Sequence, residues 1–241
     1  MFNLRSALVG LLWFVLAASP AQAQPIYYNT SSATQSQNTL DSVATNGSAN
    51  TVLFTATGPG SNNVIRCTAV AVDALNGKLF LLDGVSNALW SVNLNGSGLA
   101  LVRSGLTNYP TDLALDVLNQ QIYLTTSSTI LGNNTVQRMD YSGSNNTTLF
   151  AATAVSGVSR CTAIAVDTRS AKIFFADAGA QKIWSMSLAG SNLTALATVT
   201  NAFPTGIAVD PTNQQVYFTA SSTVQNSNVI QRVNYNGSGL T

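Results

Sequence analysis

The chain has 241 residues, only 8% of them charged, and its ten basic residues nearly balance nine acids, all aspartate, with no histidine or glutamate. It therefore lacks the usual general base near neutral pH, the commonest metal ligand and the paired glutamates of many hydrolases, which argues against most enzyme classes. The basic residues form no run that could neutralise phosphates, so the composition also argues against nucleic-acid binding.

The first 23 residues have the layout of a secretory signal peptide. One positive charge at Arg5 precedes an apolar core at 7–18, and the small-x-small triplet Ala21-Gln22-Ala23 follows. The core is shorter than the roughly 20 residues of a membrane-spanning helix, so we expect cleavage after Ala23 rather than an uncleaved anchor. No later segment is long and apolar enough to span a bilayer. We therefore predict a secreted protein, extracellular or periplasmic, without a membrane span in the mature chain.

The rest of the chain is a tandem repeat. The segment 66–73, Arg-Cys-Thr-Ala-Val-Ala-Val-Asp, returns 94 positions later at 160–167 with one change, and the segment 110–116 returns as 204–210 at the same spacing. Each 94-residue unit has two related halves, because the aspartates that end these segments are 43, 51 and 43 residues apart. A mean period of about 47 residues with strand-like content is typical of β-propeller blades.

Within each half-unit, alternation and turn residues predict four short strands. In the first complete half-unit they lie at 68–72, 78–82, 88–94 and 99–103, with Asn-Gly-Ser-Gly at 95–98 before the last strand. Asn-Gly between alternating apolar runs is the strongest short-range hairpin signal. Four antiparallel strands per unit, repeated radially, predict an all-β chain with β-propeller architecture.

The second strand of each half-unit carries a related pentapeptide. The four copies are Leu-Phe-Leu-Leu-Asp at 79–83, Ile-Tyr-Leu-Thr-Thr at 122–126, Ile-Phe-Phe-Ala-Asp at 173–177 and Val-Tyr-Phe-Thr-Ala at 216–220. An aspartate-ended strand precedes each copy, and an Asn-Gly-Ser-like turn follows it. These features resemble degenerate YWTD boxes of low-density-lipoprotein-receptor class B repeats over essentially the whole mature chain. The resemblance implies a six-bladed propeller, in a family whose members are mostly extracellular binding or scaffold domains.

The repeat divides the mature chain into five units. They span 24–60, 61–104, 105–154, 155–198 and 199–241, which corresponds to about 4.6 blades of about 47 residues. The first unit opens with Ile26-Tyr27, which matches the second-strand pair Ile122-Tyr123, so we expect it to lack its innermost strand and the other four to be complete. Two unit types alternate along the chain. This alternation predicts six blades in the complete protein, and hence a sequence truncated at its C-terminus.

Two cysteines, Cys67 and Cys161, occupy equivalent positions two blades apart. The rotation between blades should separate their Cα atoms by more than the ~7 Å that a disulfide tolerates, so we expect two separate thiols. They are either small buried residues of the inner strands or, beside arginines at the channel mouth, thiols whose thiolate form is favoured. The candidate channel-mouth residues, including two aromatic residues before alternate inner strands, are Arg66, Cys67, Arg160, Cys161, Tyr109 and Phe203.

The repeated aspartates are the other candidate site residues, because carboxylates are the hard oxygen ligands that calcium prefers. They occur once per half-unit, however, without a clustered Asp-x-Asp-x-Asp loop. We expect each to close the turn after its strand by accepting hydrogen bonds from backbone N–H groups. We therefore predict no catalytic residue, cofactor or metal ligand. These structural aspartates are Asp73, Asp116, Asp167 and Asp210.

Three functions are compatible with these features. The favoured one is a secreted, non-catalytic binding or scaffold propeller that uses one face of the ring for an extracellular protein or carbohydrate. The second is a lactonase-like or lyase-like propeller enzyme with a metal in its central channel. The third is a surface-layer component in which the incomplete first blade accepts a strand from a neighbouring molecule.

Overall fold

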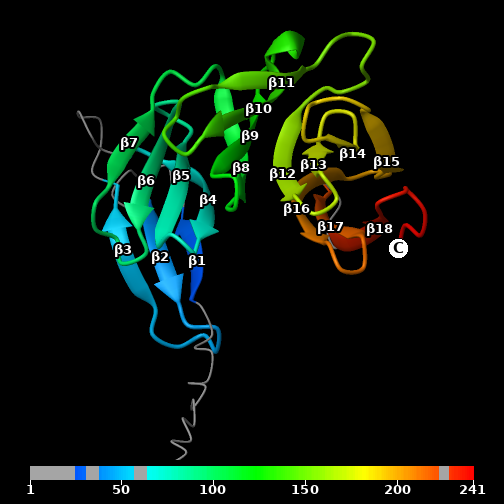
Figure 1. Ribbon diagram of the computed structural model, residues 1–241. Coiled ribbons are helices and arrows are strands. Elements are labelled where there is room, and N and C mark those ends of the chain that lie inside the picture. The colour runs from blue at the N-terminus through cyan, green and yellow to red at the C-terminus, as the bar shows by residue number, and fades with distance from the viewer. Residues whose placement is uncertain (1–24, 31–37, 57–63, 223–227) are drawn as a thin grey trace, which may run out of the picture.

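The computed structural model describes residues 25–30, 38–56, 64–222 and 228–241 (Figure 1). The predicted signal peptide lies outside these residues. Within them the regular structure is β-strand, apart from one turn of 3-10 helix at Leu131–Asn133. No helix in these ranges is long and apolar enough to cross a membrane.

The strands form five antiparallel sheets in chain order, and neighbours within a sheet are neighbours in sequence. The first sheet contains β1 (Ile26–Thr30), β2 (Thr39–Val43) and β3 (Thr51–Thr55). The second contains β4 (Cys67–Asp73), β5 (Lys78–Asp83), β6 (Ala88–Asn93) and β7 (Ala100–Arg103). The third contains β8 (Tyr109–Asp116), β9 (Gln121–Ser127), β10 (Thr135–Asp140) and β11 (Thr147–Ala151).

The remaining two sheets continue the same pattern. The fourth contains β12 (Cys161–Asp167), β13 (Lys172–Asp177), β14 (Lys182–Ser187) and β15 (Thr194–Thr198). The fifth contains β16 (Phe203–Asp210), β17 (Gln215–Ser221) and β18 (Val229–Asn234).

The sheets follow one another along an arc, with the first and last at its two ends (Figure 1). The strands β4, β8, β12 and β16 contact one another in turn, so the first strand of each of these sheets lies on the inner side of the arc. The chain is thus an all-β propeller with five blades, and the predicted four-stranded antiparallel blade is confirmed for the middle three. The described residues form five blades, whereas the repeat length predicted about 4.6. That the complete protein forms a six-bladed ring remains a prediction.

The two end sheets have three strands each. The first begins with β1, which carries the second-strand sequence Ile-Tyr and pairs in the described residues only with β2. The expectation of a complete last blade was wrong. Thr241 exchanges backbone hydrogen bonds of 2.9 and 3.0 Å with Arg232. It is the repeat equivalent of Thr147, where β11 starts, so only the first residue of a fourth strand is paired.

Apolar side chains fill the space between neighbouring blades. Each of the four core clusters combines residues from two consecutive sheets. The ring of Phe80 in β5 packs on Tyr141 of the next blade at a centroid distance of 4.5 Å, and the repeat-equivalent pair Phe174 and Tyr235 packs at 4.3 Å. An aromatic pair of this kind adds about 1 kcal/mol to the gain from burial alone. The blades are therefore stable mainly through contact with their neighbours.

A glycine turn forms a second repeated contact between blades. Gly96 has a φ of +83°, and a Cβ at this position would lie 2.6 Å from the carbonyl oxygen of Leu53 in β3. The equivalent turn glycines Gly143 and Gly190 lie against the outermost strand of the preceding blade in the same way. Only glycine combines this backbone conformation with so close an approach. The Asn-Gly-Ser-like turns therefore make the hairpin and also seat each blade on the one before it.

The repeated aspartates close the turns between the first two strands. Asp73, Asp116 and Asp210 each accept a hydrogen bond from the backbone N–H of the residue three positions later and a bond of 2.7 Å from its asparagine side chain. Asp167 accepts hydrogen bonds from the N–H groups of Arg169 and Ser170. These carboxylates are used by the backbone, as the sequence predicts for structural turn residues.

Candidate functional site

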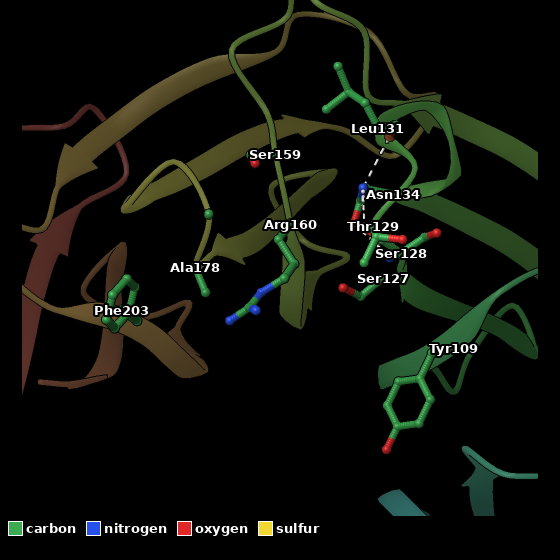
Figure 2. A pocket seen from close by; sticks show the side chains of 11 residues that line it. Tyr109, Ser127, Ser128, Thr129, Leu131, Asn134, Ser159, Arg160, Ala178 and Phe203 are labelled. Atoms are coloured by element: carbon green, nitrogen blue, oxygen red, sulfur yellow. Dashed lines mark hydrogen bonds between the residues drawn. The ribbon is translucent and has the colours of Figure 1, made fainter. Parts of the chain in front are cut away.

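One face of the propeller contains a pocket of about 740 Å³ between the third, fourth and fifth blades (Figure 2). It lies where Tyr109 opens β8, Arg160 precedes β12 and Phe203 opens β16. Three of the six candidate channel-mouth residues thus line one cavity. The remaining lining residues are Ser127, Ser128, Thr129, Leu131, Asn134, Ser159, Ala178 and Gly179.

The backbone of Arg160 is held by a buried carboxylate. Asp177, at the end of β13, accepts hydrogen bonds from the N–H groups of Ser159 and Arg160, both at 2.8 Å. The same carboxylate accepts bonds from the N–H groups of Gly179 and Ala180 and from the indole Nε1 of Trp184. The loop before β12 and the turn after β13 are therefore joined at one point, which gives Arg160 a rigid base.

The side chain of Arg160 points into the pocket (Figure 2). It is exposed, and within the described part of the chain its guanidinium has no hydrogen-bond partner and no carboxylate in ion-pair range. Among the described residues that line the pocket, Arg160 is the only charged one. As far as the described residues show, the cavity therefore presents one positive charge without an ion-pair partner.

The repeat-equivalent arginine has a different environment. Arg66, whose backbone N–H is likewise bonded to a box aspartate, Asp83, donates from Nη2 to the hydroxyl of Tyr109 at 3.0 Å. Its guanidinium carbon lies 5.6 Å from the centroid of the same ring, which is a cation–π distance. At the position equivalent to Tyr109, the chain has Phe203, which offers no hydroxyl acceptor to Arg160. The two repeat-equivalent arginines thus differ, because the guanidinium of Arg66 already contacts a tyrosine of the chain and that of Arg160 faces the pocket.

A loop on the third blade builds the opposite wall of the pocket. The amide of Asn134 donates from Nδ2 to the carbonyl oxygens of Ser128 and Leu131, both at 3.1 Å, and its Oδ1 accepts from the N–H of Ser128. These bonds fix the loop 127–134, so the hydroxyl groups of Ser127 and Thr129 lie at the pocket (Figure 2). The wall opposite Arg160 therefore combines hydroxyl and amide groups with the apolar Leu131, and none of its described residues is charged.

The two cysteines do not belong to this surface. Cys67 and Cys161 are free thiols, only 2% and 0% exposed, and each is part of an apolar core between blades. Burial raises the pKa of Cys67 to about 12, and it raises the pKa of Cys161 as well. The hypothesis of reactive thiolates at the channel mouth was wrong, because the side chains point into the core and burial disfavours their charged form.

One acid near the inner strands breaks the repeat and was missed from the sequence. Asp112 in β8 has Gly206 as its equivalent, and its carboxylate accepts hydrogen bonds of 2.9 Å from the N–H groups of Ile164 and Leu113. Burial raises the pKa of Asp112 to about 6. The signal that could have found it is the Asp-to-Gly difference between repeats. In the described residues no three His, Cys, Asp or Glu side chains form a group that could hold a metal ion.

Comparison with known proteins shows the fold alone. Protein-family models and curated sequences gave no match to this chain. The crystal structure of a nidogen/laminin complex superimposes with a TM-score of 0.70 at 15% identity, over 90% of this chain and 76% of that chain. A putative TolB from Agrobacterium tumefaciens gives 0.66 at 13%, over 89% and 75%, and TolB from Acinetobacter baumannii gives 0.67 at 11%, over 89% and 51%.

Proposed function

We propose that this chain is a secreted, non-catalytic binding propeller of YWTD-like type that recognises an extracellular protein through the face carrying the pocket. The observation that carries the proposal is the pocket itself, in which Arg160, whose guanidinium has no partner among the described residues, faces the hydroxyl groups of Ser127 and Thr129. Because Asp177 holds the backbone that carries Arg160, a partner that binds there has only the side chain to order.

Three observations support a protein rather than a carbohydrate as the partner. Ile130, which is 64% exposed, lies between the pocket residues Thr129 and Leu131, and Val155, which is 95% exposed, lies in the loop that leads to Arg160. Tyr109 and Phe203 at the pocket are each 38% exposed. Exposed apolar and aromatic side chains around an arginine are typical of protein interfaces. A similar propeller is found in a complex named for two proteins, nidogen and laminin.

Secretion is proposed from the leader sequence. Its support is the order of charge, apolar core and small-residue triplet before Gln24. Mass spectrometry of the protein recovered from the medium or the periplasm tests this point, because cleavage after Ala23 would give a chain that begins at Gln24.

The two alternatives have less support. For a propeller enzyme, the acid closest to a catalytic candidate is Asp112, but both of its oxygens accept backbone hydrogen bonds. For an assembly component, the supporting feature is β1, whose inner edge has no partner strand in the described residues. A strand donated by a second copy would produce concentration-dependent oligomers, which sedimentation of the purified protein would detect.

A comparison of the two faces tests the binding proposal. The variant Arg160→Glu/Phe203→Glu changes the pocket face, and Leu118→Glu changes a turn at the far end of β8, where the leucine is 82% exposed. Immobilised wild type and variants are incubated with the extracellular fraction of the source cells. We expect a partner that the Leu118 variant retains and the pocket-face variant loses. Equal retention by both variants, or the absence of any retained partner, would contradict the proposal.

A further inference from the structure

We infer that Arg160 is the receptor for a carboxylate of a polypeptide partner, either an aspartate or glutamate side chain or a C-terminal carboxylate. This inference rests on the binding function proposed above and names the group that the pocket recognises. It follows from a comparison of the two arginine sites within the same chain.

The first step is that the fold shows one partner that an arginine at this position can have. In the earlier repeat, Arg66 donates to the oxygen of Tyr109 at 3.0 Å. A guanidinium has five donors and no acceptor, so an oxygen within hydrogen-bond distance suits it; at Arg66 one such oxygen is present, whereas its Nε has no partner among the described residues. Arg160 presents the same donors to a cavity, and no described residue accepts a hydrogen bond from its guanidinium.

The second step explains why the chain itself does not fill the site. Phe203 lacks the hydroxyl of Tyr109. A second difference is at Ala178, which has Gly84 as its equivalent. A Cβ at Gly84 would lie 2.6 Å from the Tyr109 ring, so the aromatic ring can reach that place only because the residue is glycine. Ala178 carries this Cβ, and the Phe203 ring cannot occupy the equivalent place. Two differences between the repeats, at positions about 25 residues apart in sequence, thus act together to leave the guanidinium of Arg160 accessible to a ligand.

The third step identifies the ligand class. A guanidinium forms paired, charge-assisted hydrogen bonds with a carboxylate, and the planar fork of donors matches its two oxygens. Arg160 is the only cation among the described lining residues, which suits a carboxylate of charge −1 better than a phosphate of nearly −2. The pocket also has no carboxylate of its own, among the described residues, that would repel the ligand.

The fourth step favours a polypeptide over an acidic sugar as the source of the carboxylate. The exposed Leu131 lines the pocket, and the exposed Ile130 is its neighbour in the chain. Apolar side chains that flank an acidic residue in a peptide would be buried on this surface, with a gain of about 25 cal/mol per Å². A polyuronate has no side chains of that kind.

The experiment uses the secreted chain and two blocked pentapeptides, acetyl-Gly-Leu-Asp-Leu-Gly-amide and its asparagine counterpart. Binding is followed by the NMR signal of the Arg160 Nε–H group at low ionic strength. We expect the acidic peptide to bind at least about tenfold more tightly than the amide peptide, since one charged hydrogen-bond pair has about that effect. Binding of the acidic peptide should be lost in Arg160→Gln and weakened in Arg160→Lys, which keeps the charge but not the fork.

The repeat provides the matched controls. Arg66→Gln should bind the acidic peptide as the wild type does. The double variant Ala178→Gly/Phe203→Tyr rebuilds the environment of Arg66 around Arg160, so the new hydroxyl should compete with the peptide and lower its affinity at least about fivefold. Thermal unfolding verifies that each variant is folded, and Arg160→Gln changes only an exposed side chain.

Several results would overturn the inference. They are equal binding of the two peptides, no binding of either peptide at 20 mM, an equal loss in Arg66→Gln, and unchanged affinity in the double variant. Tighter binding of a galacturonate trimer than of the acidic peptide would reject the polypeptide source. If Arg160→Gln retains the cellular partner while Phe203→Glu loses it, the carboxylate inference fails and the proposed binding face remains.

Discussion

Replacing Asp112 by asparagine should stabilise the protein at neutral pH. The Asp112 carboxyl is half-buried between the inner strands β8 and β12, and it accepts two backbone hydrogen bonds, from Ile164 and Leu113. Burial outweighs these bonds and raises the pKa of Asp112 from 3.8 to about 6. Asparagine retains an oxygen that can accept from Ile164 but has no charge to desolvate.

The sign and size of the effect follow from proton linkage. Between pH 3.8 and about 6 the folded state keeps the Asp112 proton, whereas the unfolded state has already lost it. Raising the pH through this window therefore lowers the free energy of unfolding of the wild type. Two pKa units correspond to about 3 kcal/mol, which is an upper limit because the carboxyl is partly solvated. The variant lacks this loss, so its advantage should grow from pH 4 to pH 7.

Urea unfolding of the wild type and Asp112→Asn at several pH values measures this difference. Asp210→Asn is a control of opposite sign. Hydrogen bonds from Asn213 lower the pKa of Asp210, so its contribution to stability is present above the unfolded pKa and is lost as the pH falls. A difference between wild type and Asp112→Asn that stays constant from pH 4 to pH 7 would refute the reasoning.

Three further predictions concern the blade contacts and the core. Gly96→Ala should lower the free energy of unfolding, measured in urea, by about 3 kcal/mol, because a strained φ adds to a clash with a carbonyl oxygen. The control Gly47→Ala, at a φ of +80° with nothing within 4 Å, should lower it by only about 1 kcal/mol. Equal losses in the two variants would exclude the clash. Asp177→Ala should lower the free energy of unfolding by at least about 3 kcal/mol, because four backbone N–H groups lose their acceptor. A decrease of less than about 1 kcal/mol would show that these hydrogen bonds are dispensable. Both cysteines should resist a thiol reagent in the folded protein and react fully in denaturant, and rapid labelling without denaturant would contradict their burial.

Much of the fold was predictable because the repeat reports it several times. The strand at Lys78–Asp83 ends one residue beyond the expected 78–82, and Ala100–Arg103 begins one residue after the expected 99–103. Alternation and Asn-Gly turns are local signals, so they locate strands well. The number of strands in the last blade was not predictable in this way, since a single residue, Thr241, represents the fourth strand.

The candidate site was predictable only in part. The position of Arg160 before an inner strand was visible in the repeat, and so were the aromatic residues Tyr109 and Phe203. The guanidinium of Arg160 has no partner among the described residues, and this depends on Ala178 and Phe203, which lie 18 and 43 positions along the chain and meet the site only after folding. The burial of Cys161 has a similar cause, because the strand that carries the thiol turns it toward the neighbouring blade. Repeat positions are equivalent in backbone, and the differences in side chains between copies decide the chemistry.

The glycine turns determine which blades unfold locally most easily. Gly96, Gly143 and Gly190 each bring a blade onto the outermost strand of the one before it, so every such contact joins only consecutive blades. An array coupled through nearest neighbours behaves like a one-dimensional chain, in which a unit with one neighbour opens more readily than a unit with two. Amide hydrogen exchange should therefore be fastest in the first and last sheets and slowest in the central blade, whose inner strand β8 begins at the pocket.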